Sequence, residues 1–182
     1  MEHILLLSGG IDSTALLHYL LGKKRDVLCV HFQYGQSNDI SEKKSVEKIT
    51  SYYKCDLKII NLGFPKSLRK NELIGRNTYF ILAGSSLGFS PAIIYLGIHK
   101  GTDYYDCSNR FIKDVQNILD GYFAGTVQIE TPFINNDKSD IISYCEKNNV
   151  PLNMTYSCLI KNFPPCGKCS SCLERGVYNE YK

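Results

Sequence analysis

The sequence has no long run of apolar residues and no marked excess of charge of one sign. Its longest apolar stretches, such as Ala92 to Ile98, fall far short of the roughly 18 residues that cross a bilayer. The formal net charge is +3, and Lys and Arg are scattered except at residues 23–25, so the composition does not predict nucleic-acid binding. Because Met1 leads straight into a strand pattern without a secretory signal, we expect a cytoplasmic protein without a membrane segment.

The sequence also lacks internal repeats and low-complexity segments. With 43% hydrophobic and 21% charged residues among 182, it has the composition of a globular protein with one substantial core. The periodic pattern stops near Pro151, after which prolines, glycines and cysteines dominate. We therefore predict a domain over residues 1–150 and an appended tail over residues 151–182.

Apolar runs bounded by turn residues alternate with segments at helical spacing. The expected strands cover residues 4–7, 27–32, 57–62, 92–98 and 127–134. The expected helices cover residues 13–21, 41–54, 76–88, 108–122 and 137–149. In the second of these helices, Ile40, Val46, Ile49 and Tyr53 lie on or near one face. This alternation predicts an α/β fold: an open, mostly parallel five-stranded sheet with helices on both faces.

The first strand is followed by the loop SGGIDS, which starts at Ser8. Loops in this position of an open α/β sheet commonly bind phosphate, because two glycines let backbone N–H groups face an anion at a helix N-terminus. The loop lacks both GxxxxGK[ST] and the third glycine of the dinucleotide fingerprint. From these residues alone it is either a phosphate site or a tight turn capped by Ser13 or Asp12.

Four of the eight cysteines form a C-x₇-C-x₂-C-x₂-C array, and they are Cys158, Cys166, Cys169 and Cys172. In a chain without a secretory signal, such a cluster predicts a metal site rather than disulfides. Four thiolates suit a tetrahedral Zn²⁺ with no open position, which would be structural and would fix the tail. An iron–sulfur cluster is the alternative that this spacing leaves open.

Together, the loop and the cysteine array resemble the 7-cyano-7-deazaguanine synthase family of the queuosine pathway, within the N-type ATP pyrophosphatases. The resemblance is carried, in chain order, by SGGIDSTALL, HFQYGQ, IGRN, DYYDCSNRFI, ETPFINNDKSDII and TYSCLIKNFPPCGKCSSCLERG. The stretch between HFQYGQ and IGRN is shorter here than in typical members of the family. In the family, the longer loop helps to enclose the substrate.

The resemblance implies an adenine nucleotide alpha hydrolase-like, Rossmann-like fold that uses ATP and Mg²⁺ and holds a structural Zn²⁺. It implies catalytic roles for Asp12, Arg76 and Lys138, with Asp12 helping to organise Mg²⁺. It places the ATP contacts at Ser8, Gly9, Gly10, Asp12, Ser13, Thr14, His31, Phe32 and Asn77. It places the substrate contacts at Tyr34, Gln36, Asp103 and Asp106.

Six of these side chains also have a simpler interpretation. Lys138 lies in the first turn of a helix, where its charge opposes the macrodipole, so either an anion such as phosphate lies nearby or the side chain is solvated beside Asp137 and Asp140. Arg76 is either a phosphate or carboxylate clamp or a surface arginine at a helix start. Tyr34 and Gln36 form either a lid or a turn, and Asp103 and Asp106 could merely cap turns.

The reaction that the resemblance implies is ATP-dependent adenylation of the carboxylate of 7-carboxy-7-deazaguanine. Ammonia would then give the amide, and a second ATP would drive its dehydration to the nitrile. Some relatives in antiviral defence (type IV CBASS) instead modify the N-terminal amine of a partner cyclase of the CD-NTase type, so a protein amine is the alternative acceptor. Relatives commonly form homodimers.

Two other classes of function are weighed against this reaction. A tRNA-modifying pyrophosphatase would need a basic patch or an RNA-binding domain, and the sequence has neither. A non-catalytic binding module would not need an intact SGGIDS loop together with Lys138.

Overall fold

The computed structural model describes residues 1–63, 73–101, 104–160 and 162–177. Its five strands are β1 (Glu2–Leu6), β2 (Val27–Gln33), β3 (Leu57–Asn61), β4 (Ala92–Tyr95) and β5 (Val127–Glu130). The α-helices are α1 (Ile11–Gly22), α2 (Asp39–Tyr53), α3 (Arg76–Ser85), α4 (Asn109–Phe123), α5 (Lys138–Lys147) and α6 (Ser170–Val177). Two short 3₁₀ helices, η2 (Tyr105–Cys107) and η3 (Leu152–Met154), complete the described elements.

The strands form one parallel sheet in the order β3-β2-β1-β4-β5. This confirms the predicted α/β fold. The strand order reverses beside β1, because the chain runs outward through β2 and β3 and then returns to place β4 on the other side. In such sheets, the carboxyl ends of the strands at the reversal point form the usual ligand crevice. Here the segments that follow β1 and β4 meet at this point.

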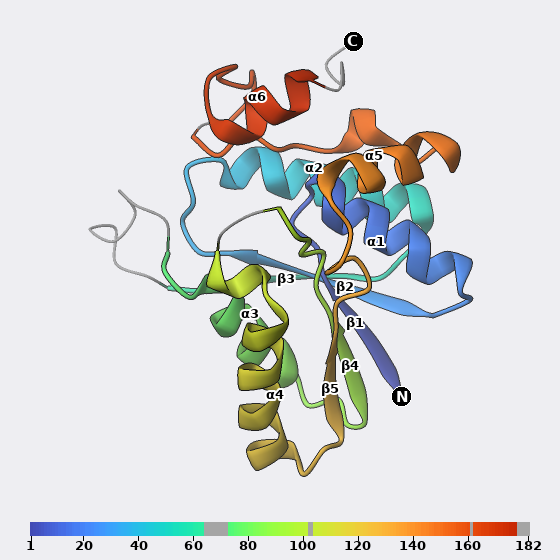
Figure 1. Ribbon diagram of the computed structural model, residues 1–182, viewed down its shortest axis with the longest axis vertical. Helices are drawn as coiled ribbons and strands as arrows, with labels where there is room; N and C mark the ends of the chain where they lie inside the picture. Colours follow the sequence, from blue (N-terminus) through green and yellow to red (C-terminus); the bar gives the residue numbers. More distant parts are fainter. Residues whose placement is uncertain (64–72, 102–103, 161, 178–182) are drawn as a thin grey trace.

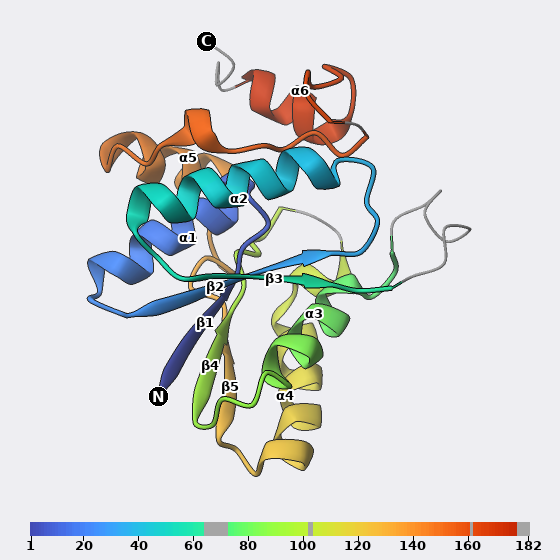
Figure 2. The same cartoon turned by 180° about the vertical axis from the view of Figure 1, so that it is seen from behind.

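Helices cover both faces of the sheet, as Figures 1 and 2 show: α1, α2 and α5 lie on one face, and α3 and α4 lie on the other. Successive strand residues point to opposite faces. Leu5 therefore packs in the core beneath α1, α2 and α5, whereas Ile4 packs in the core beneath α3 and α4. Both side chains are fully buried, so β1 anchors the loop that follows it from two sides.

Several predicted boundaries and one predicted contact are wrong. The fourth strand ends at Tyr95 rather than at residue 98, and the fifth ends at Glu130, just before a turn that contains Pro132. Proline has no N–H group to continue the strand pairing. Ile40 does not join the apolar face of α2, because it lies in the first turn and is 55% exposed. Val46 and Ile49 are buried as expected.

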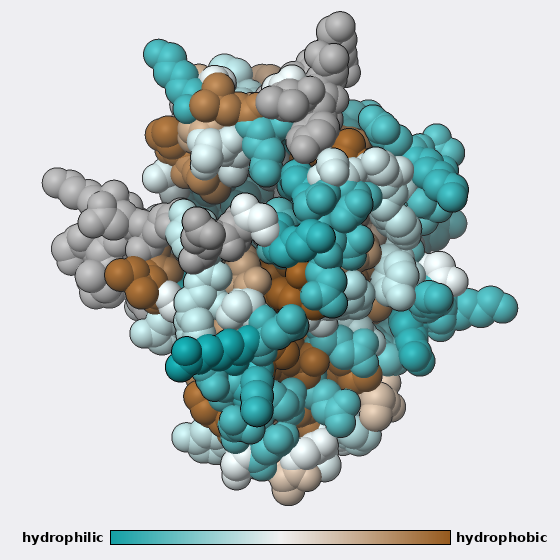
Figure 3. All heavy atoms as spheres, in the orientation of Figure 1, coloured by the Kyte–Doolittle hydropathy of each residue, from teal (hydrophilic) through white to brown (hydrophobic). Residues whose placement is uncertain are grey.

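The tail after Pro151 packs along α2 and ends in α6, a helix that the sequence pattern did not predict. Figure 3 shows apolar side chains gathered over this part of the surface, and Ile160 and Phe163 are 56% and 81% exposed. The buried cluster of the tail consists of cysteines. The tail therefore has little core of its own. The proposed division at residue 150 stays a prediction.

Among the described residues, no helix is long and apolar enough to span a membrane, and the longest, α2 and α4, have 15 residues each.

Candidate functional site

The loop after β1 leads directly into α1, and no side chain caps that helix. Gly9 has φ +84°, and a Cβ there would lie 3.1 Å from Ser45 Oγ, so both conformation and space require glycine. The N-cap is Gly10, and the hydroxyls of Ser13 and Thr14 donate to its carbonyl oxygen at 3.2 and 2.7 Å. Neither Ser13 nor Asp12 therefore caps α1, as the tight-turn alternative would require. The start of α1 keeps its dipole available for an anion.

The carboxylate of Asp12 is held by Lys138 instead. Lys138 Nζ donates to Asp12 Oδ1 at 2.7 Å, and the lysine side chain is 13% exposed. Asp137 and Asp140 use their carboxylates in a capping box at the start of α5 and do not hold this ammonium group. Lys138 therefore lies against an anion, although the partner seen here is a protein carboxylate. His99 Nε2 lies 3.9 Å from the same Asp12 oxygen.

A second group of polar residues follows β2 and begins α3. Arg76 Nη1 donates to the Tyr34 hydroxyl at 3.4 Å, and Asn77 Nδ2 donates to Asp106 Oδ2 at 2.9 Å. These contacts join the loop after β2 to η2 across α3. They bring the positive charge of Arg76 and the negative charge of Asp106 to the lining of the cavity that the start of α1 also lines.

His31 is almost fully buried at the end of β2. Its Nδ1 lies 3.0 Å from the Leu7 carbonyl oxygen, so in the neutral ring this nitrogen carries the proton and Nε2 is an acceptor. Burial lowers the pKa of His31, which favours the neutral form. Within the described part of the chain, Nε2 has no hydrogen-bond partner.

These groups line one cavity of about 600 Å³, a size typical of small-molecule sites. Of the predicted site residues, Ser8, Gly10, Asp12, Ser13, His31, Phe32, Tyr34, Arg76, Asn77, Asp106 and Lys138 line it. Gly9 and Thr14 do not line the cavity: Gly9 lies close to Ser45, and Thr14 Oγ1 donates to Gly10 O. Asp103 lies outside the described residues. Gln36 does not line the cavity. Its side chain holds the turn after β2, accepting from Tyr34 N and donating to Phe32 O.

Sequence reasoning missed Glu42, which also lines the cavity from the first turn of α2. Its two carboxylate oxygens accept hydrogen bonds from Gln36 Nε2 and Asn38 Nδ2 at 2.8 and 2.9 Å. Burial raises the pKa of the Glu42 carboxyl, while these amides and the charge of Arg76 act in the opposite direction. No signal in the sequence distinguishes Glu42 from the solvated charges that follow it on α2.

Gly97, which follows β4, was also missed. A Cβ at this position would lie 2.9 Å from Ser13 N and 3.0 Å from Asp12 O. Glycine is therefore required because α1 begins against the backbone of residue 97. The signal that could have found it is a glycine at the carboxyl end of a central strand.

Replacing Gly97 with alanine is expected to push the start of α1 out of position. Overpacking of this kind typically costs about 1–3 kcal/mol of stability. Because a misplacement of about 1 Å can cost about 10²-fold in catalysis, we expect a higher KM for a substrate that binds at this helix start, in addition to the loss of stability. The control is Gly121→Ala in α4, where a Cβ would meet no atom within 4 Å. Similar kinetics in the two variants would contradict the close approach.

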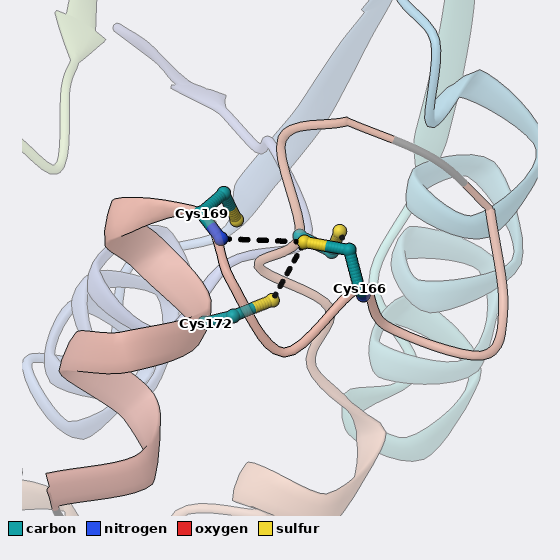
Figure 4. Close-up of side chains that lie close together, drawn as sticks. Cys166, Cys169 and Cys172 are labelled. Atoms are coloured by element: carbon teal, nitrogen blue, oxygen red, sulfur yellow. Dashed lines mark hydrogen bonds between the residues drawn. The ribbon is translucent and has the colours of Figure 1, made fainter.

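The four tail cysteines converge on one point, which Figure 4 shows for Cys166, Cys169 and Cys172. Their sulfur atoms and that of Cys158 all lie within 4.8 Å of one another. The backbone N–H groups of Lys168 and Cys169 donate to Cys166 Sγ at 3.4 and 3.3 Å, and they lower the pKa of the Cys166 thiol. Four sulfurs with N–H donors around them fit a tetrahedral metal ion that is held by thiolates.

Comparison with known proteins gives a consistent family assignment. The family model described as queuosine biosynthesis protein QueC matches residues 2–81 and 75–181. The 7-cyano-7-deazaguanine synthase of Archaeoglobus fulgidus is 31% identical over 96% of this chain and 84% of its own length. The synthase of Nautilia profundicola is 29% identical over 93% and 89%. The latter alignment spans 200 positions, so the relative carries residues that this chain lacks.

Solved structures with similar folds are more distant in sequence. A predicted subunit of tRNA methyltransferase from Methanocaldococcus jannaschii has a TM-score of 0.59 at 16% identity, covering 81% of this chain and 76% of that one. A 4-thiouridine synthetase bound to RNA and ATP has a TM-score of 0.56 at 19% identity, covering 98% and 50%. These likenesses support the fold. Because the family model matches nearly the whole chain, the protein belongs to the QueC family.

Proposed function

We propose that the protein uses ATP to activate the carboxylate of 7-carboxy-7-deazaguanine and, with ammonia, converts it to the nitrile 7-cyano-7-deazaguanine. The observation that carries the proposal is the uncapped start of α1 beside Lys138, inside a cavity of a QueC-family chain. The family relatives are synthases of this nitrile.

The α1 start is the proposed site of the ATP phosphates. Backbone N–H groups and the helix dipole favour the polyphosphate there, and Ser8 and Ser13 add hydroxyls whose oxygens lie 3.0 Å apart. Lys138 would neutralise charge that develops on the departing pyrophosphate. Asp12 would hold Mg²⁺, which supplies further charge neutralisation at the phosphates when it is bound.

The part of the cavity lined by the start of α3 and by η2 is the proposed site of the deazaguanine. Arg76, which lines the cavity, would pair with the substrate carboxylate, and the hydrogen-bonded pair of Asn77 and Asp106 would offer polar groups to the ring. His31 Nε2 and the Phe32 ring would face the adenine of ATP. Substrate contacts by Gln36 and Asp103 stay predictions.

The reaction then needs no side-chain nucleophile. A carboxylate oxygen attacks the α-phosphorus of ATP, pyrophosphate leaves, and an acyl-adenylate forms. Ammonia attacks the acyl carbon and AMP leaves, which gives the amide. The amide oxygen then attacks a second ATP, pyrophosphate leaves again, and loss of AMP and two protons forms the nitrile. The protein contributes positioning and charge to each step.

The cysteine cluster is proposed to hold one structural Zn²⁺. In a closed four-thiolate site, no cysteine is free to act as a nucleophile. The role of the metal would therefore be structural, and it would stabilise the tail. We therefore expect a colourless protein, because an iron–sulfur cluster would absorb near 400 nm.

The proposed function is tested by incubating the protein with ATP, Mg²⁺ and 7-carboxy-7-deazaguanine, with and without ammonium. The expected result is substrate-dependent AMP and, only with ammonium, a product with the mass of the nitrile. Absence of substrate-dependent AMP would overturn the proposal. AMP formation without any nitrile, together with a protein that gains the deazaguanine acyl mass, would replace ammonia with a protein amine as the acceptor.

A further inference from the structure

The cysteine tail contributes charged side chains to the cavity through α6. Glu174 and Arg175 line the cavity and lie just after Cys172 in the sequence. Glu174 Oε2 lies 3.9 Å from Lys138 Nζ, on the ammonium group that Asp12 Oδ1 holds at 2.7 Å. Lys138 therefore has carboxylates from two different elements within 4 Å.

The position of α6 relative to the loop SGGIDS, residues 8–13 and hereafter the phosphate loop, is fixed by hydrogen bonds of the tail. Tyr156 N donates to Gly9 O at 2.8 Å, and Ser45 Oγ bridges Gly9 O and Met154 O at 2.9 and 2.7 Å. The tail is thus hydrogen-bonded to the loop at Gly9, the residue with the positive φ just before α1.

Arg175 ties α6 itself to this part of the tail. It is 3% exposed, and it donates to Leu152 O at 2.7 Å and to Ser157 Oγ at 3.2 Å. Since Arg175 is fixed, its neighbour Glu174 is held near Lys138 by the backbone of α6. The Glu174 side chain is 46% exposed and supports no core packing that would explain its place.

Binding of a triphosphate would change the charged partners of Lys138. A triphosphate at the start of α1 would compete with Asp12 for Lys138, and a long lysine side chain that loses one partner can adopt many conformations. A second carboxylate, that of Glu174, would keep the ammonium group near the phosphates when the bond to Asp12 is lost. We propose that Glu174 is a positioning residue that holds Lys138 in its working place, so that the metal-bound tail forms part of the nucleotide site. This proposal builds on the proposed function.

A double-mutant cycle tests this proposal, using Glu174→Gln, Lys138→Ala and the double variant. Binding of a non-hydrolysable ATP analogue with Mg²⁺ is measured by calorimetry, and kcat and the KM for ATP are measured by AMP release. If Glu174 acts through Lys138, the effects are not additive, and Glu174→Gln changes little once Lys138 is absent. In the otherwise unchanged protein, we expect Glu174→Gln to lower kcat about ten- to a hundredfold, the scale of a mispositioned group. Glu174→Asp should restore part of this loss.

The outcomes separate this role from simpler ones. Bound ATP would bring its phosphates close to Glu174. If this carboxylate only repels them, its removal would lower the KM for ATP and leave kcat unchanged. That result overturns the proposal, as do additive effects. Glu146→Gln removes an exposed carboxylate of α5 as a charge control. The metal content and the melting temperature of Glu174→Gln and of Glu146→Gln should match those of the unmodified protein. If the unmodified protein turns over no 7-carboxy-7-deazaguanine, the proposed function fails, while the binding cycle still decides the role of Glu174.

Discussion

Replacing Lys138 with alanine is expected to lower the rate of ATP-dependent carboxylate activation by about 10²- to 10³-fold, the usual cost of removing one preorganised charge-stabilising donor. Among the proposed site residues, Lys138 has the clearest structural support for a role in charge stabilisation. Its ammonium group is largely buried, lies 2.7 Å from Asp12, and faces the start of α1, where the polyphosphate is proposed to bind. The rate is measured as substrate-dependent AMP formation at saturating ATP.

Two further variants define what the lysine supplies. Lys138→Arg keeps the charge but changes its shape and reach, so partial activity is expected. Lys147→Ala removes an exposed lysine at the other end of α5 and should leave the rate unchanged. A Lys138→Ala protein that keeps its fold and its full rate would show that the Asp12 pair is only a structural ion pair.

Replacing Cys172 with serine is expected to release the metal and to disorder the tail. A structural site with three thiolates holds zinc far less tightly, and the tail buries little apolar surface that could replace the metal. Because Tyr156 and α6 contact the phosphate loop and Lys138, the KM for ATP should rise by about tenfold or more, which corresponds to about 1.4 kcal/mol of lost binding. Metal content, absorbance near 400 nm and the KM for ATP are measured on the same sample.

The matched control is Cys55→Ser, which removes a thiol outside the tail. This variant should keep one equivalent of zinc and an unchanged KM for ATP. A Cys172→Ser protein that still holds stoichiometric metal would contradict the assignment of the four ligands. An absorbance band near 400 nm in the unmodified protein would replace zinc with an iron–sulfur cluster.

The sequence predicted the five strands and the five helices between residues 1 and 150, because apolar runs bounded by turn residues and helical spacing are local patterns. The predicted fourth and fifth strands were too long, because apolar residues continue beyond the last paired residues of β4 and β5. The helix α6 was missed because it is only eight residues long, and it begins within the cysteine array, where the sequence has little apolar periodicity.

Residues that line the cavity or form the cysteine cluster could be picked out from the sequence where a local signal existed. The glycine loop and the cysteine array have characteristic spacings, and Lys138 was conspicuous because its charge opposes the dipole of its own helix. Its partner Asp12 lies 126 residues away, and no local pattern reports such a contact. The same reason hid Glu42, Gly97 and Glu174, whose roles come from the elements that the fold brings against them.

The most direct test of the central claim follows the oxygen atoms of the substrate. 7-Carboxy-7-deazaguanine labelled with ¹⁸O in its carboxylate is incubated with ATP, Mg²⁺ and ammonium, and the AMP is analysed by mass spectrometry. Because a carboxylate or amide oxygen attacks the α-phosphorus in each activation, every AMP formed with the product should carry one ¹⁸O. Unlabelled AMP, or label that appears in inorganic phosphate, would contradict adenylation of the carboxylate by this protein.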